Sequence, residues 1–341
     1  MNRKILTLII TVGLLSCNQK KPDLICKRIN YLIDVKNETA KNYWSDFNRK
    51  TLFSPMLYYT EHGLYTINAN ERLKNEVNIE PYNCISSKVT IGFSKIIDTT
   101  NFYMNVSYDD VDSTALEFKN TLGMFSDVDL TEKFIPDVKD TEEWMTMVIH
   151  EMFHQYQRSF KEFRKRQESS QRDFKRDTLD YLYKNKDWFH KSVKKENKIL
   201  LEILDLKDYD SINRYLSEYL KNKEQRILKL RNEEGLDILN LENSLSKSEG
   251  TARYIEYCVK LTLKEESNNK TLSEIDDKYQ SNRFENYELR QDEWMYNLGG
   301  GYYYSIGFNL TRVLEKLKID YQKDIFFKNQ SFDSYLNEYI K

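Results

Sequence analysis

Residues 140–158, DTEEWMTMVIHEMFHQYQR, are the most informative part of the chain for its architecture. Asp140 is a good N-cap, and Glu143 follows three positions later in the register of a capping box, so we predict a helix from about Thr141. Apolar side chains then occur on nearly every face of this helix, which is typical of a helix buried on all sides. The stretch therefore predicts a helix in the core of the protein.

Two of the four histidines of the chain, His150 and His154, lie in this predicted helix. Positions i and i+4 of a helix share one face, so both imidazoles can reach one zinc ion. Glu151 lies next to that face, where its carboxylate can take a proton from a zinc-activated water. Three polar groups in a core helix would be costly unless something satisfied them. The motif therefore predicts a zinc site with Glu151 as the general base.

A catalytic zinc ion needs a third protein ligand. The third histidine of the metzincin pattern would stand where the chain has Phe160, so that class is excluded. His190 lies between aromatic residues and a basic run and fits a surface or packed histidine better than a ligand. The best candidate is Glu249, and Glu256, two turns further along the same face, is the alternative. Because Ser246 and Glu249 have capping-box spacing, Glu249 can also be read as closing a helix N-terminus.

The segment around this glutamate, residues 248–257, reads SEGTARYIEY and opens a second apolar helix. Gly250 and Ala252 are small, which would let this helix approach the first one closely, as a shared metal requires. The two segments together resemble gluzincin-type metallopeptidases, in which a His-Glu-x-x-His helix is completed by a glutamate in a Glu-Gly-x-Ala segment. The resemblance covers roughly residues 140–260.

The resemblance implies a zinc metallopeptidase with a zincin-like domain, in which His150, His154 and Glu249 bind Zn²⁺ and Glu151 is the base. The chain departs from the thermolysin arrangement at Arg253, where an aspartate four residues after the ligand glutamate is expected. The residues that orient the metal ligands are therefore not predicted. Two alternatives remain open: a zinc amidase acting on a cell-wall component, and a non-catalytic cell-surface binding lipoprotein on the same scaffold.

The first 17 residues read as a processing segment. Two positive residues precede the apolar run 5–15, which is too short to span a bilayer core that needs about 20 residues. The ending LLSC, residues 14–17, resembles the lipobox of bacterial lipoproteins. It implies that Cys17 is lipidated and anchors the mature chain to a bacterial membrane in the cell envelope, with the outer membrane, on its periplasmic or surface side, as the expected place.

Charge and cysteine content narrow the function classes further. Removal of residues 1–16 takes away two positive charges, so the net charge changes from −2 to −4. This mildly acidic charge does not indicate a nucleic-acid-binding protein, which would carry an excess of basic residues. The expected partners are a peptide or protein substrate and the membrane. In an exported chain, Cys26 and Cys84 are the more plausible disulfide pair, while Cys258 in an apolar helix fits a buried thiol.

The rest of the chain predicts an α+β, mainly helical fold, because glycine (10) and proline (4) are rare. We expect an N-terminal α/β region with a small sheet over residues 18–139 and a helical catalytic domain over 140–341. Charge runs in the second region fit solvated helix surface. The predicted strands are 56–65, 88–93 and 102–108, and the further predicted helices are 24–47, 170–183, 187–206, 211–221 and 222–240.

The only cluster of glycines, residues 299–301, precedes three tyrosines. If this segment is helical, Tyr296, Gly300, Tyr303 and Gly307 line one stripe. Such a stripe is most typical of core packing, with the glycines admitting a neighbouring helix. As an alternative, the hydroxyl of Tyr303 or Tyr296 would donate to an oxyanion.

Overall fold

The structure is a computed structural model, and its fold is α+β and mainly helical, as predicted. The predicted signal segment with Cys17 lies outside the described residues, as do Tyr296 and Gly300. The described residues are 24–49, 54–84, 88–95, 102–108, 121–173, 176–265, 269–289 and 301–341.

The described strands form one small mixed sheet in the order β3-β4-β2-β1-β6-β5, in which β1 and β6 are the parallel pair. The predicted strand 56–65 is a hairpin, because the chain turns at Glu61 and His62. Two strands were missed: β3 has two residues, and β6 contains Gly123, which weakens a strand pattern. The strands are β1 (Met56–Thr60), β2 (Gly63–Ile67), β3 (Glu80–Pro81), β4 (Ile91–Ser94), β5 (Met104–Tyr108) and β6 (Thr121–Ser126).

Most of the described chain is helical, and several predicted boundaries need correction. The predicted helix 24–47 ends at Tyr43 and is followed by a separate short 3-10 helix. The predicted helix 170–183 covers the end of one helix, which stops at Asp173, and most of another, which starts at Arg176. Residues 211–240 do not form two helices that meet at 221: one helix continues through this point to Glu234, and the side chain of Asn222 donates to Ser192 of a neighbouring helix. The helix that carries Glu249 begins at Leu239, before the predicted start. The helices are α1 (Leu24–Tyr43), η1 (Ser45–Asn48), α2 (Glu71–Val77), α3 (Val128–Phe134), α4 (Thr141–Arg158), α5 (Lys161–Asp173), α6 (Arg176–Asn185), α7 (Asp187–Asp205), α8 (Tyr209–Glu234), α9 (Leu239–Glu265), α10 (Lys270–Ile275), α11 (Tyr302–Lys316) and α12 (Phe332–Ile340).

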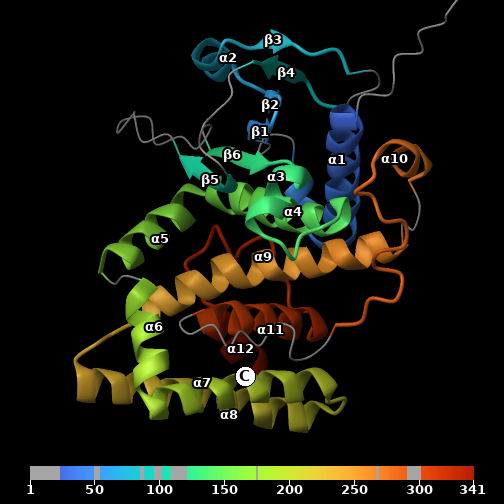
Figure 1. Ribbon diagram of the computed structural model, residues 1–341. Coiled ribbons are helices and arrows are strands. Elements are labelled where there is room, and N and C mark those ends of the chain that lie inside the picture. Colours follow the sequence, from blue (N-terminus) through green and yellow to red (C-terminus); the bar gives the residue numbers. More distant parts are fainter. Residues whose placement is uncertain are drawn as a thin grey trace, which may run out of the picture.

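The elements are stacked in layers (Figure 1). The sheet lies at one end with α4 beneath it, and α9, α11 and the pair α7 and α8 follow in turn. α4 contacts β5 and β6 on one side and α9 on the other, so it lies between the sheet and the helical layers. The predicted motif helix is therefore placed at the centre of the fold.

α4 is the core helix that the sequence predicts. The side chain of Asp140 accepts from the backbone N–H of Glu143 at 2.7 Å, which caps the helix as expected. The Glu143 carboxylate forms an ion pair with Lys260 of α9, at 3.4 Å. Trp144 and Phe153 are fully buried, and Trp144 Nε1 donates to the carbonyl of Ser126 in β6. These contacts hold α4 against both of its neighbours.

The segment 248–257 of α9 makes its closest backbone contact with α11 and not with α4. A Cβ atom added to Gly250 would lie 2.3 Å from Gly307 Cα, and one added to Gly307 would lie 2.1 Å from the carbonyl oxygen of Ser246. α9 and α11 thus cross with their backbones in contact, which only glycine permits at these positions. The expectation that Gly250 lets α4 approach α9 closely is wrong, because Gly250 faces α11. The predicted packing role of Gly307 is confirmed.

A buried charge cluster fixes the start of α9. Arg226 of α8 binds Glu196 of α7 at 2.7 Å and Glu242 of α9 at 2.7 Å. The hydroxyl of Tyr302, at the start of α11, donates to Glu242. Each charge is paired, as burial of ionised groups requires. Four helices are therefore held in register at the end of α9 that precedes the second motif.

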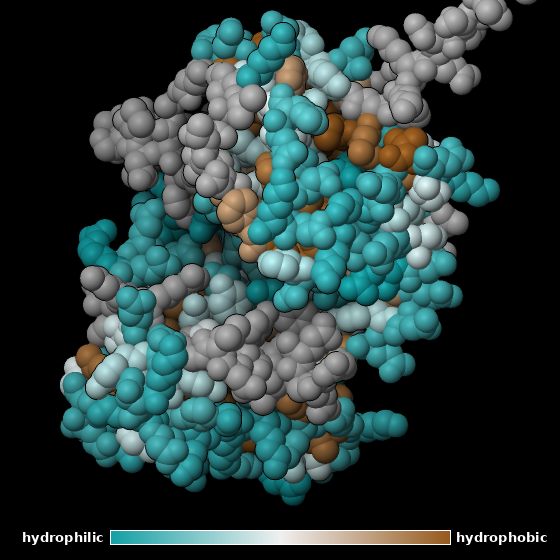
Figure 2. Space-filling model, viewed as in Figure 1, coloured by the Kyte–Doolittle hydropathy of each residue, from teal (hydrophilic) through white to brown (hydrophobic). Residues whose placement is uncertain are grey.

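Two smaller predictions are confirmed. Cys26 and Cys84 form a disulfide with a Cα–Cα distance of 5.7 Å, and Cys258 is a free, buried thiol. The charge runs lie on solvated helix surface: the ion pair of Asp187 and Lys191 on α7, for example, is more than two-thirds exposed on both sides. Figure 2 shows the same character over the helices at the lower end, where the face in view is mostly hydrophilic.

Candidate metal centre

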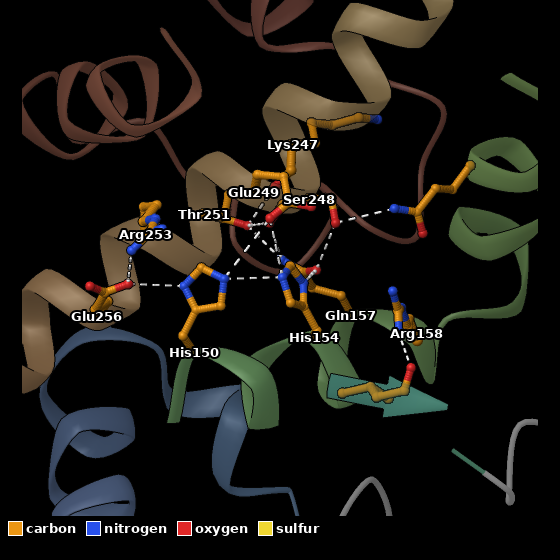
Figure 3. Close-up of polar contacts among 12 residues, drawn as sticks. His150, His154, Gln157, Arg158, Lys247, Ser248, Glu249, Thr251, Arg253 and Glu256 are labelled. Carbon is orange, nitrogen blue, oxygen red and sulfur yellow. Dashed lines mark hydrogen bonds and ion pairs between the residues drawn. The ribbon is translucent and has the colours of Figure 1, made fainter. Parts of the chain in front are cut away.

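Three side chains from the two predicted motifs converge at one buried point (Figure 3). His150 Nε2 lies 3.1 Å from His154 Nε2, and Glu249 Oε2 lies 3.3 Å from His154 Nε2 and 3.9 Å from His150 Nε2. All three residues are buried, with exposed fractions of 5–7%. The group can hold a metal ion.

The local structure explains this convergence. His150 and His154 lie one turn apart on α4, so their rings stand on the same face with centroids 4.8 Å apart. Glu249 comes from the middle of α9, where that helix packs on α4. It is not at a helix N-terminus, so the capping interpretation of Glu249 is wrong.

A carboxylate orients the first histidine. Glu256 Oε2 lies 3.1 Å from His150 Nδ1, on the opposite side of the ring from the convergence point. Because a carboxylate only accepts, Nδ1 carries the hydrogen, which in the neutral ring leaves the lone pair on Nε2. Arg253 donates to the same oxygen at 2.6 Å. Burial alone would raise the pKa of Glu256, but Arg253 and His150 outweigh it and lower the pKa to about 2.

Glu256, the alternative ligand of the sequence, is therefore placed where it orients His150 and does not face the metal point. Arg253, which stands at the position of the expected aspartate, holds this carboxylate. The carboxylate that orients His150 thus comes seven residues after Glu249, whereas the resemblance led us to expect one after four.

An amide orients the second histidine. Gln157 Oε1 lies 2.8 Å from His154 Nδ1. Its Nε2 donates at 2.8 Å to the Ser248 carbonyl and at 2.8 Å to the Thr251 hydroxyl, so the amide oxygen must face the ring. His154 Nδ1 is then the donor, so in the neutral ring Nε2 also carries the lone pair. Sequence reasoning missed Gln157; its signal was the spacing of three residues after His154 on a buried helix.

The convergence of acceptors favours a positive charge between them. Two imidazole lone pairs and a carboxylate oxygen face one another in a buried place, which is unfavourable unless a cation or a proton lies there. Burial by itself lowers the pKa of His154, but the Glu249 carboxylate outweighs it and raises the pKa. Both the geometry and the electrostatics therefore suit a cation.

The donor set and spacing fit a tetrahedral ion with nitrogen and oxygen ligands. For metal–ligand distances of about 2.0–2.1 Å, tetrahedral ligand atoms stand about 3.3 Å apart. The observed separations of 3.1, 3.3 and 3.9 Å bracket that value. Two neutral imidazoles with one carboxylate suit a borderline ion better than the all-oxygen ions calcium and magnesium.

An open cavity of about 280 Å³ gives access to this group. Glu151 is half-buried and lines the cavity together with the edge strand β5. Arg158, at the end of α4, donates to the carbonyl of Val106 in β5 at 2.8 Å and so joins the two walls. Because the cavity is open, a water and a substrate can reach the three converging side chains.

Among the described residues that line this cavity, the tyrosine is Tyr304. Tyr303 is buried in the core, with an exposed fraction of 4%; its ring stacks on Tyr304 and meets the ring of Tyr302 edge to face. Tyr304 lines the cavity, and the Arg253 guanidinium lies 5.3 Å from the centre of its ring. The core-packing interpretation of Tyr303 is confirmed. His190 likewise packs: its ring stacks on Tyr183 at 4.3 Å.

Replacing Glu256 with glutamine tests the orienting role. The amide oxygen can still accept from His150 Nδ1, but the charge that fixes the ring is lost and Arg253 loses its ion partner. We expect zinc affinity to fall about 10- to 100-fold while saturating zinc still fills one site per chain. Competition with a fluorescent zinc chelator measures both quantities. A stoichiometry near zero at saturating zinc would instead make Glu256 a ligand.

Among the described residues, no helix is both long and apolar enough to cross a bilayer. No protein-family model matches the chain, and no curated protein or solved structure shows significant similarity to it.

Proposed function

We propose that this protein is a zinc-dependent hydrolase, and specifically a metallopeptidase. One observation carries the proposal: two histidine Nε2 lone pairs and the Glu249 carboxylate converge on the floor of an open cavity that Glu151 also lines. A purely structural site would be closed by a fourth protein ligand. Among the described residues the group has three members, which is the composition of catalytic zinc sites.

The roles of the residues follow from their positions. His150, His154 and Glu249 would hold the ion, and zinc, when bound, supplies Lewis-acid polarisation of the scissile carbonyl and activation of water. Glu151 follows His150 directly and projects beside the ligand face, so its carboxylate accepts the proton of the attacking water. The same carboxylate then passes the proton to the nitrogen of the leaving amine. Glu256 and Gln157 keep both rings in the required tautomer.

The sequence and the disulfide also support a place for this enzyme in the bacterial cell envelope. The lipobox-like LLSC at residues 14–17 supports lipidation of Cys17 and attachment to a bacterial envelope membrane. The disulfide between Cys26 and Cys84 suits an oxidising compartment outside the cytosol. A peptide or protein exposed at that membrane is the proposed substrate.

Metal content and hydrolysis, measured on the mature chain expressed from residue 18, test the proposal. We expect about one zinc per chain by elemental analysis and cleavage of casein or of a mixed peptide library. Removal of zinc by a chelator should abolish cleavage, and stoichiometric zinc should restore it. A protein that holds zinc but cleaves nothing in the panel would favour a binding lipoprotein, and one that holds no zinc would refute both enzyme functions.

A further inference from the structure

We propose that a second cavity, on the face of α9 opposite the metal group, binds a small oxyanion. This cavity has a volume of about 330 Å³ and lies between α5, α9 and the segment 329–334 that leads into α12. Asn240, Asn243, Ser244 and Lys247 recur at intervals of three and four on α9, so they share one stripe. Glu249 is two residues beyond the stripe, on the other side of the helix.

The charged side chains that line the cavity, among the described residues, are all positive. Among its described lining residues there is no carboxylate, while Lys247 and Arg166 both line it. The remaining lining groups that carry polar side chains are amides and hydroxyls. A pocket of this kind attracts an anion and has donors to orient it.

Lys247 is the central group because it is held in place inside the cavity wall. Its exposed fraction is 6%, and its Nζ donates to the carbonyl of Gln330 at 3.0 Å. An ammonium has three donors, so Nζ can donate to a ligand while this bond persists. Burial and the nearby Arg166 lower the pKa of Lys247 to about 8, which leaves it mostly charged at neutral pH and favours an anion beside it.

Two further groups support an anion at this place. Ser244 is buried at 7% exposure, and its hydroxyl has no hydrogen-bond partner within the part of the chain that the structure describes. Ser331 caps α12, and both Ser331 and Ser334 line the cavity, so the positive end of that helix faces it.

The nearby acid does not cancel this charge. Asp333, in the first turn of α12, is bound by Lys223 at 2.6 Å, and Lys223 also donates to Asn243 at 3.0 Å. The charges of Lys223 and Asp333 cancel each other, so the positive charges of Lys247 and Arg166 at the cavity are left without a compensating carboxylate from this pair. The volume suits a phosphate or carboxylate carried on a compact polar molecule, with Phe163 as the apolar wall.

Calorimetric titration of the mature chain with inorganic phosphate and, separately, with succinate tests the inference at an ionic strength matched with sodium chloride. We expect saturable binding of at least one of the two, which also tells phosphate from carboxylate chemistry. Lys247→Met should weaken binding about 10- to 100-fold, the effect of one charge-assisted hydrogen bond. Arg166→Gln, a milder change at a half-buried position, should also weaken anion binding, by a smaller factor.

The controls separate this site from the metal centre. Arg172→Gln removes an exposed charge from the same helix as Arg166 and should bind like the wild type. Glu249→Ala should also bind the anion normally, because the two sites lie on opposite faces of α9. Absence of binding by both anions, or equal binding by wild type and Arg166→Gln, would overturn the inference and leave the proposed peptidase untouched.

Discussion

Glu249→Ala should leave the purified protein almost free of zinc. The residue supplies the only carboxylate among the three converging atoms of the described metal group, 3.3 Å from His154 Nε2 and 3.9 Å from His150 Nε2. If three ligands share a binding free energy of about 10 kcal/mol, the loss of one costs roughly 3 kcal/mol, or more than about 100-fold in affinity. The loss also removes the negative charge that offsets the ion. Elemental analysis after dialysis measures the result.

Two matched variants make this result interpretable. Glu249→Gln keeps the size of the side chain but not its charge, so it separates a metal role from a packing role beside Gly250. Glu256→Gln should still bind one zinc per chain when zinc is saturating. If Glu249→Ala retained one tightly held zinc while Glu256→Gln lost it, the ligand assignment would be reversed. Helix content by circular dichroism should be the same in all three proteins.

Local periodicity explains why the two histidines of this site could be predicted. His150 and His154 are one helical turn apart, so their shared face follows from the sequence once the helix is accepted. Asp140 and the all-round apolar pattern make the helix itself predictable, and the structure has it at Thr141–Arg158. Glu249 could be proposed because a glutamate beside small residues stands in an apolar segment far along the chain.

The sequence favoured Glu249 over Glu256 because small residues follow Glu249, but helical periodicity alone could not decide between them. The two residues are seven apart and share a face of α9, so periodicity ranks them equally. Which of them meets the Nε2 side of His150 depends on how α9 crosses α4. That crossing is set by contacts distant in sequence, such as Glu143 on Lys260 and the Gln157 amide on the Ser248 carbonyl. Sequence patterns carry no information about such crossings.

The same limit applies to the neighbours of the site. Tyr303 and Tyr304 differ by one residue, or about 100° on a helix, and only the packing of α11 decides which ring reaches the cavity. Gln157 looks like any polar residue near a helix C-terminus until α9 brings the Ser248 carbonyl and Thr251 to its amide. Residues that orient ligands act through tertiary contacts, so they are the hardest part of a metal site to predict.

Glu151→Gln should abolish hydrolysis while the protein keeps its zinc. The glutamine has the same shape but cannot accept the proton of the attacking water, and loss of a general base reduces turnover by about 10²- to 10⁴-fold. Zinc content should stay near one per chain, because Glu151 lies outside the three-residue metal group. The measurement is the rate of cleavage of a quenched fluorescent peptide, taken with zinc content from the same sample. Glu162→Gln, an exposed change on α5, serves as the matched control and should cleave at the wild-type rate. Loss of zinc from Glu151→Gln would show that this carboxylate supports the metal instead of moving the proton, and full activity would refute the general-base role.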